Sequence, residues 1–178
     1  VSGALERALG DPAPEVRFHA AIAMRRADIL VQVARDELAQ ASVRSDAFAR
    51  AVNLAPQASD TVAMVRAWSL GADAKRRVQA IQVLPEVTND VEEYALETLR
   101  RLEEDSEDEE ALIALLAVLA KWGTARSVPH LTPYRNRFFD SALRVKATDA
   151  IRAIQARIGS SRGDLALAPE AGWLSEPE

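Results

Sequence analysis

Apolar residues recur along most of the chain at intervals of three and four, the spacing of a helix that buries one face. Short polar residues precede many of these apolar segments, and Gly or Pro often follows them. A side-chain oxygen satisfies free amides at a helix start, whereas Gly and Pro stop helical propagation. The pattern therefore predicts about ten short helices joined by short turns.

The predicted helix boundaries follow from these caps and breakers. The helices are expected at residues 2–9, 15–26, 28–41, 45–55, 59–71, 73–84, 89–102, 106–122, 125–137 and 140–158. The predicted N-caps are Asp28, Ser45, Ser59 or Asp60, Asp73 and Asp140. Two capping boxes are also predicted, in which a residue at the helix start and a Glu three positions later satisfy each other's backbone amides. They pair Asn89 with Glu92 and Ser106 with Glu109.

The helical segments repeat. Every second helix contains the same short pattern of apolar residues, and the last apolar residue of each copy serves as an anchor. These anchors lie 30 to 35 residues apart: Met24, Leu54, Leu84, Leu119 and Ile151. Six positions before each anchor lies another apolar residue: Phe18, Phe48, Val78, Ile113 and Val145. The second copy departs most from the pattern, with Arg50 and Asn53 at irregular positions. Five helix pairs at this period predict an α-solenoid, in which each repeat packs only on its neighbours.

Two segments resemble HEAT repeats in the shorter form common in bacterial proteins: "VRFHAAIAM" following "DPAPE", and "LAKWGTARSVPHL". The resemblance covers most of residues 1–158 and is closest in the first unit and from Ala111 onward. It implies an all-α, right-handed solenoid of about five HEAT-like pairs, whose second helices line one surface. It also implies that Gly123 takes a backbone conformation other residues resist, and that Pro129 lies in the first turn of the next helix.

Residues 159–178 differ from the rest and are expected to form a short non-helical tail after the 1–158 solenoid. Leu165 and Leu167 alternate with small or polar residues, which is consistent with a short hairpin. A disordered linker is the alternative, because chain ends that nothing ties down usually fray.

Charge and composition narrow the classes of function. The net charge of −5 argues against nucleic-acid binding, which needs a basic field to neutralise phosphates. The chain has no cysteine, so disulfides, thiol catalysis and cysteine-bound metals are excluded. No apolar run approaches the roughly 20 residues that span a bilayer. We therefore expect a cytoplasmic protein, and the abundance of Ala and Arg is typical of a high-GC bacterial source.

The repeated arginines Arg17, Arg77 and Arg144 have two interpretations. They could present a row of cations to an acidic partner. We favour pairing between repeats, with carboxylates of neighbouring turns as partners: Asp11, Asp73 and Asp140 are the candidates.

The apolar row from Phe18 to Val145 could likewise be an exposed binding stripe, but we favour core packing, since a helix inside a stack buries several faces. The acidic run at 103–110 could bind a basic partner or Ca²⁺, or present Ser106 for phosphorylation. It lacks the spacing of a calcium loop and is favoured as a solvated turn. The two histidines, His19 and His130, have no partner at metal-binding spacing and are expected on the surface.

No Gly-rich phosphate loop, nucleophile elbow or His–carboxylate motif is present. Carboxylates are abundant, so a Glu/Asp pair for acid–base catalysis stays open as an alternative. The prediction is nevertheless that the chain is not an enzyme and needs neither cofactor nor metal. The predicted function is a non-catalytic scaffold that binds another protein on a rigid helical surface, without membrane or small-molecule substrate. The proposed contact residues are Phe18, Arg25, Phe48, Val78 and Arg152.

The alternative is a nucleic-acid-binding protein related to the HEAT-like alkylpurine DNA glycosylases. Those enzymes resemble this chain in their stacked helix pairs, but they present a concave basic surface. Trp68 and Trp122 could suit such a role. The acidic balance does not, and no Asp of this chain matches their catalytic residue.

Overall fold

The computed structural model describes residues 2–105, 108–136 and 141–166. Within these ranges the chain is helical and contains no strand, so the predicted all-α class is confirmed. The elements are α1 (Ser2–Ala8), α2 (Pro14–Ala23), α3 (Ala27–Arg35), α4 (Ala41–Leu54), α5 (Ser59–Ser69), α6 (Ala74–Gln82), α7 (Leu84–Val87), α8 (Val91–Asp105), α9 (Glu109–Trp122), the 3-10 turn η1 (Ala125–Ser127), α10 (Val128–Arg135) and α11 (Ser141–Ala166).

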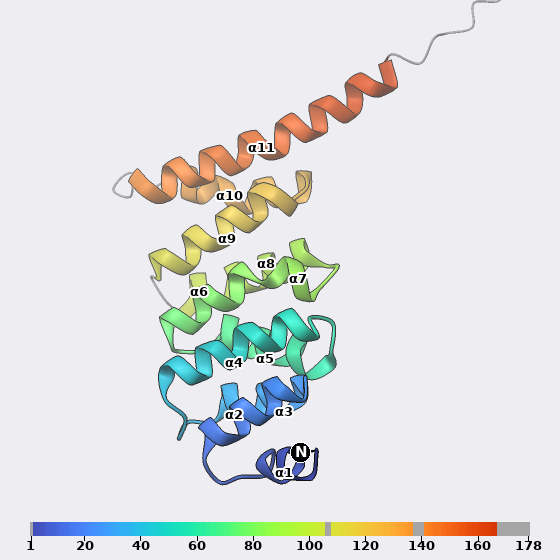
Figure 1. Ribbon diagram of the computed structural model, residues 1–178. Helices are drawn as coiled ribbons and strands as arrows, with labels where there is room; N and C mark the ends of the chain where they lie inside the picture. The colour runs from blue at the N-terminus through green and yellow to red at the C-terminus, as the bar shows by residue number, and fades with distance from the viewer. Residues whose placement is uncertain (1, 106–107, 137–140, 167–178) are drawn as a thin grey trace, which may run out of the picture.

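The helices follow one another in chain order, from α1 at one end of the molecule to α11 at the other (Figure 1). They fall into two layers. The B layer contains α2, α4, α6, α9 and α11, and the A layer contains the helices that precede each of them. Within the B layer, α2 packs on α4, α6 on α9, and α9 on α11. Each B-layer helix also packs on the A-layer helix just before it, as α4 does on α3.

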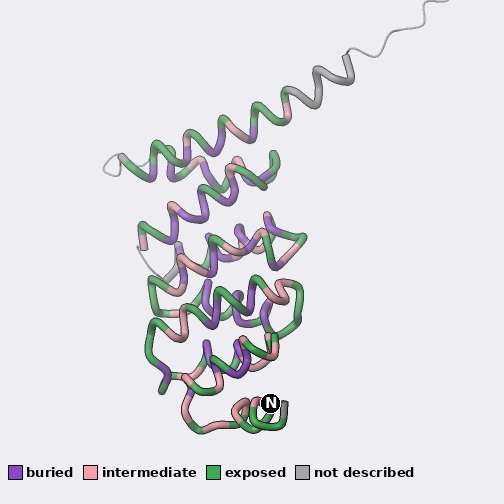
Figure 2. The backbone as a smooth tube through the Cα atoms, viewed as in Figure 1, coloured by how far each residue is buried: buried purple, intermediate pink, exposed green. Residues whose placement is uncertain are grey.

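The hydrophobic core runs along the stack between the two layers, as the buried positions in Figure 2 show. One cluster of buried side chains extends from α2 to α7, and a second extends from α6 to α11. They meet in α6, where Ala80 belongs to the first cluster and Ile81 to the second. Helix α6 therefore joins the two halves of the core.

The repeated apolar row is partly core and partly surface. Phe18 and Phe48 are 7% and 3% exposed, and the Phe48 ring stacks on Trp68 with 4.4 Å between centroids. Core packing is thus confirmed for these two residues, and neither forms part of an exposed stripe. Val78 is half-buried, whereas Val145 is 52% exposed because it lies on α11, the last helix of the stack.

Some predicted helix ends are confirmed and others are wrong. Asp73 caps α6, because its carboxylate accepts the Arg76 amide at 3.1 Å. Asp28 is not a cap: the turn after α2 is so tight that α3 begins at Ala27, and Asp28 binds the Arg26 guanidinium instead. Ser45 lies inside α4. That helix begins at Ala41 because α3 already ends at Arg35.

Of the two predicted capping boxes, one includes a residue outside the described ranges and the other is wrong. Ser106 lies outside the described residues, and α9 is capped by Asp108, whose carboxylate accepts the Ala111 amide at 3.1 Å. Glu92 does not close a box with Asn89. Its carboxylate reaches the turn before α10 and accepts hydrogen bonds from Thr124 and Ser127.

Helix α11 is longer than predicted. It passes through Gly159 and ends at Ala166, so the non-helical tail does not begin at residue 159. Gly159 does not adopt the left-handed conformation that ends helices, and a Cβ there would meet nothing within 4 Å. Glycine disfavours a helix interior but does not by itself stop it. The rest of the predicted tail, 167–178, and the predicted cap Asp140 lie outside the described residues.

Gly123 ends α9 as predicted, but for a different reason. Its φ of −69° and ψ of 153° are open to any residue, so no special backbone conformation is involved. A Cβ at this position would instead lie 2.5 Å from the Leu119 carbonyl oxygen and 2.8 Å from the Ser127 hydroxyl. Pro129 lies in the first turn of α10, as expected.

Two of the repeated arginines tie successive repeats together in the same way. The Arg17 guanidinium donates to the Asp11 carbonyl, six residues earlier, and pairs with the Asp36 carboxylate in the next turn between layers. Arg77 donates to the carbonyl of Gly71, again six residues earlier, and pairs with Asp108 at 2.6 Å.

Pairing between repeats is therefore confirmed for Arg17 and Arg77, but the predicted carboxylates were wrong. Asp11 contributes its carbonyl to Arg17 instead of its side chain. The Asp73 carboxylate caps α6 and pairs with the Arg76 guanidinium at 3.4 Å, whereas Arg77 pairs with Asp108. The third arginine, Arg144, is exposed on α11.

Candidate partner-binding surface

Three of the open depressions on the B layer follow one another along the stack, and each shares one lining residue with the next. The first lies where α2, α3 and α4 meet and has a volume of about 300 Å³. The second, between α4 and α6, measures about 250 Å³, and the third, between α6 and α9, about 390 Å³. Asn53 lines both the first and the second, and Gln82 lines both the second and the third. We call these three depressions together the B-layer groove.

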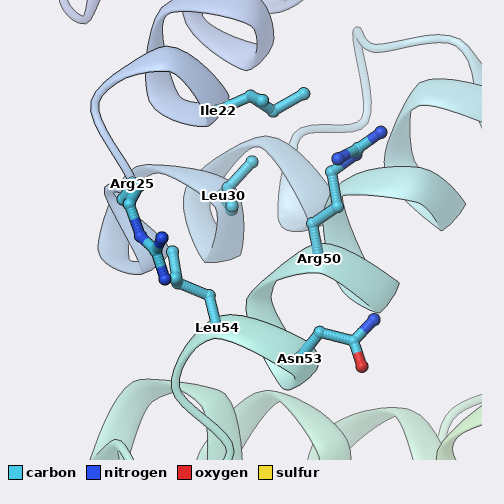
Figure 3. A pocket seen from close by; sticks show the side chains of 6 residues that line it. All are labelled: Ile22, Arg25, Leu30, Arg50, Asn53 and Leu54. Atoms are coloured by element: carbon cyan, nitrogen blue, oxygen red, sulfur yellow. The ribbon is translucent and has the colours of Figure 1, made fainter.

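The first depression combines an apolar floor with cationic sides. Ile22, Leu30 and Leu54 supply the apolar surface, and Arg25 and Arg50 stand on opposite sides of it (Figure 3). Neither guanidinium is paired with a carboxylate among the described residues. The contact resolved for Arg50 is with the Phe18 ring, at 5.9 Å from the centroid. Two available guanidiniums beside an apolar floor suit a ligand that carries both carboxylates and an apolar group.

The backbone of Arg25 is in the left-handed region, with φ at 53°. It follows the end of α2, where the Arg26 amide donates to the Ala21 carbonyl and the Arg25 amide to the Ile22 carbonyl. These two bonds form a Schellman motif, in which Gly usually occupies the left-handed position. The motif directs the Arg25 side chain into the first depression, at the cost of an unfavourable backbone conformation.

Arg25→Gly is therefore expected to raise the free energy of unfolding by about 1 kcal/mol, because Gly adopts this conformation without strain. Urea denaturation followed by circular dichroism would measure the change. Arg100→Gly, at an exposed position inside helix α8, is the control and should lower stability by about 1 kcal/mol. Destabilisation by Arg25→Gly would show that the Arg side chain contributes more to folding than the strain costs.

The third depression is the most apolar part of the groove. Val78, Ile113 and Val118 line it, together with Trp122, which is 45% exposed. Its charged lining residues are Glu110, in the first turn of α9, and Lys121, in the last turn. An exposed aromatic ring beside aliphatic side chains is typical of a surface that contacts a partner.

The five predicted contact residues are only partly brought together. Arg25 and Val78 line the groove, and Phe48 contributes to the floor of its second depression. Phe18 is buried beneath it. Arg152 lies on α11, outside the three depressions, with its side chain 76% exposed and 3.9 Å from the Asp149 carboxylate.

Two groove residues were missed that a signal in the sequence could have identified. Arg50 and Asn53 are the positions at which the second repeat departs from the apolar pattern. Both are exposed and line the first depression. A departure from a structural repeat at a surface position frees that residue for binding, since the repeat pattern itself serves packing. Trp122 carried no comparable signal.

Glu92 links the start of α8 to the turn before α10. Its carboxylate accepts the Thr124 amide at 2.8 Å and the hydroxyls of Thr124 and Ser127. Partial burial by itself would raise the pKa of Glu92, but these hydrogen bonds and the nearby Arg126 charge outweigh it and lower the pKa below its ordinary value of 4.5. The ionised carboxylate therefore stabilises the fold.

Glu92→Ala is expected to lower the free energy of unfolding by about 1 kcal/mol near neutral pH, the typical value of a lost capping interaction. Because the folded-state pKa lies below the unfolded-state pKa, this contribution is complete above the unfolded pKa and disappears as pH falls through the folded pKa. Urea denaturation at neutral pH and at about pH 3 should show the difference shrinking in acid. Glu93→Ala, an exposed neighbour, is the control.

The described residues hold no cluster of three or more His, Asp or Glu that could bind a metal ion. Among the same residues, no helix combines the length and the apolar character that crossing a bilayer requires. Comparison with models of protein families, with curated proteins and with solved structures found no match to this chain. The chemistry of the B-layer groove is therefore the basis for inferring function.

Proposed function

We propose that the chain is a right-handed α-solenoid of five HEAT-like helix pairs and that it acts as a non-catalytic protein-interaction module. The two-layer order of the helices and their 30- to 35-residue spacing support the solenoid. The common bonding pattern of Arg17 and Arg77 adds further support, because each ties its own turn to the next one.

The B-layer groove carries the functional part of the proposal. Its three depressions follow one another across α2, α4, α6 and α9, which gives an elongated surface suited to a segment of another protein. The groove lies on packed helices, so its side chains are held in place before binding. Pre-organisation of this kind reduces the conformational entropy lost on association.

The balance of charges in the groove favours a protein partner over a nucleic-acid partner. The basic residues that line its three depressions are Arg25, Arg50 and Lys121, and the acidic residues are Asp46, Glu86 and Glu110. A nucleic-acid site needs a predominance of cations along the phosphate backbone. Equal numbers of both signs beside apolar side chains suit a protein partner with mixed chemistry.

The test is retention of proteins from nuclease-treated lysate on the immobilised chain. The groove variant is Arg25→Glu with Lys121→Glu. The control is Arg100→Glu with Arg135→Glu, which changes the net charge equally at two exposed arginines away from the groove. We expect one protein to bind the wild type and the control but not the groove variant. Salt-sensitive binding of labelled DNA, abolished by the groove variant, would instead support the nucleic-acid alternative.

A further inference from the structure

We propose that the first depression of the B-layer groove binds residues 167–178 of a second copy, so that chains associate head to tail. The inference deepens the proposed function, on which it rests, by naming the partner as another molecule of this chain. It is carried by the chemical match between the lining of the depression and the sequence of that segment.

The depression requires an apolar group with negative charge on both sides. Its floor is formed by Ile22, Leu30 and Leu54, while the Arg25 and Arg50 side chains stand on either side (Figure 3). Each guanidinium could bind a carboxylate with two parallel hydrogen bonds. Arg25 reaches this place only through a left-handed backbone conformation, and strained residues of this kind concentrate at functional sites.

The segment 167–178 has the complementary pattern. Its sequence, LAPEAGWLSEPE, contains three glutamates and no Lys or Arg. Trp173 lies at its centre, with Glu170 three residues before and Glu176 three residues after it. In a polyproline II conformation, with three residues per turn and about 3.1 Å rise per residue, residues three apart share one face, so the two carboxylates can lie about 9 Å to either side of the indole. Trp provides a large apolar area and is a frequent anchor at interfaces.

The geometry of the stack favours a second copy. Helix α11, which precedes the segment, lies at the opposite end of the molecule from α2 (Figure 1). Trp173 lies seven residues beyond Ala166, a reach of about 25 Å when fully extended, and the three steps from α11 to α4 cover about 24–30 Å at ordinary helix spacings. Binding within one chain would therefore leave little slack for placing the indole. A contact between opposite ends of two copies has no such limit and can repeat from chain to chain.

Sedimentation velocity of variants of the 178-residue chain tests the proposal. The groove variant carries Arg25→Gln and Arg50→Gln, and the segment variant carries Glu170→Gln, Trp173→Ala and Glu176→Gln. We expect the wild type to form larger species as its concentration rises, and each variant to stay monomeric. An equimolar mixture of the two variants should form a dimer and nothing larger, because it retains one working groove and one working segment. Arg100→Gln with Arg135→Gln is the charge-matched control and should associate like the wild type.

A peptide-binding titration is the second test of the proposal. A fluorescently labelled peptide of sequence LAPEAGWLSEPE is titrated with the segment variant, whose groove is intact. We expect saturable binding that weakens about tenfold for each groove arginine replaced by Gln. Thermal unfolding of every variant establishes that it is folded.

Three results would overturn the proposal: a wild type that stays monomeric at all concentrations, a groove variant that still self-associates, or a variant mixture that remains monomeric. Failure of head-to-tail association can be distinguished from failure of the proposed function. If the retention experiment identifies a different protein that is lost with the groove variant, the interaction module stands and head-to-tail association does not. If nothing is retained and no self-association occurs, both fail.

Discussion

Arg77→Met is expected to lower the free energy of unfolding by about 3 kcal/mol, at the lower end of the cost of breaking a buried ion pair. The Arg77 side chain is 9% exposed and bridges two turns, through the Gly71 carbonyl and the Asp108 carboxylate. Met fills a similar space but leaves both acceptors without the guanidinium. The Asp108 carboxylate still accepts a hydrogen bond from the Ala111 amide, so the loss of stability is smaller than for a fully isolated buried charge.

The position of Arg77 predicts a second effect. It lies in α6, where the two buried clusters meet, and it binds the residue that caps α9. Repeat proteins lose cooperativity when an interface between neighbouring units is weakened. We therefore expect the urea transition of Arg77→Met to broaden as well as move to lower denaturant.

A double-mutant cycle with Asp108→Asn would isolate the pair, since coupled residues show a non-additive cost. Arg101→Met provides the control, because Arg101 pairs with Glu97 on the exposed face of α8 and such pairs contribute at most a few tenths of a kcal/mol. Equal costs for Arg77→Met and Arg101→Met would contradict the tie between repeats.

Gly123→Ala is expected to destabilise the chain by about 2–3 kcal/mol, as overpacking in a closed site does. The added Cβ would lie 2.5 Å from the Leu119 carbonyl oxygen, 2.8 Å from the Ser127 hydroxyl and 3.2 Å from the Ile154 Cδ1. The carbonyl is backbone and accepts the Gly123 amide at 2.7 Å, so relief requires the end of α9 to move.

Gly159→Ala should instead stabilise the chain. That residue lies within α11, its Cβ would meet nothing within 4 Å, and Ala is a better helix former than Gly by about 1 kcal/mol. Thermal unfolding of Gly123→Ala and Gly159→Ala would compare a position where neighbouring atoms leave no room for a Cβ with one where a Cβ fits. A neutral Gly123→Ala would mean that the turn between α9 and α10 adjusts without strain.

Much of the fold follows from local features of the sequence. The all-helical class and the cap at Asp73 depend on residues within one turn of the position concerned. Three anchors of the repeat, Leu84, Leu119 and Ile151, are buried as their spacing predicts. Met24 and Leu54, in the first two units, are less fully covered.

Contacts between distant residues account for the partners that were wrongly predicted for Arg17, Arg77 and Glu92. Arg17 and Arg77 find carboxylates 19 and 31 residues away, and Glu92 binds Thr124, 32 residues away. No local pattern distinguishes these partners from nearer carboxylates and hydroxyls. The choice depends on how tightly each turn brings the next helix across the stack.

The candidate binding surface was likewise only partly predictable from the sequence. The sequence by itself determined that alternate helices repeat, and it contained Arg25, Val78 and the irregular Arg50 and Asn53. Only the tertiary structure decided that Phe18 is buried and that Arg25 and Arg50 face one depression. The physical reason is that helical periodicity defines the faces of one helix, whereas the packing of its neighbours determines which of those faces remains exposed.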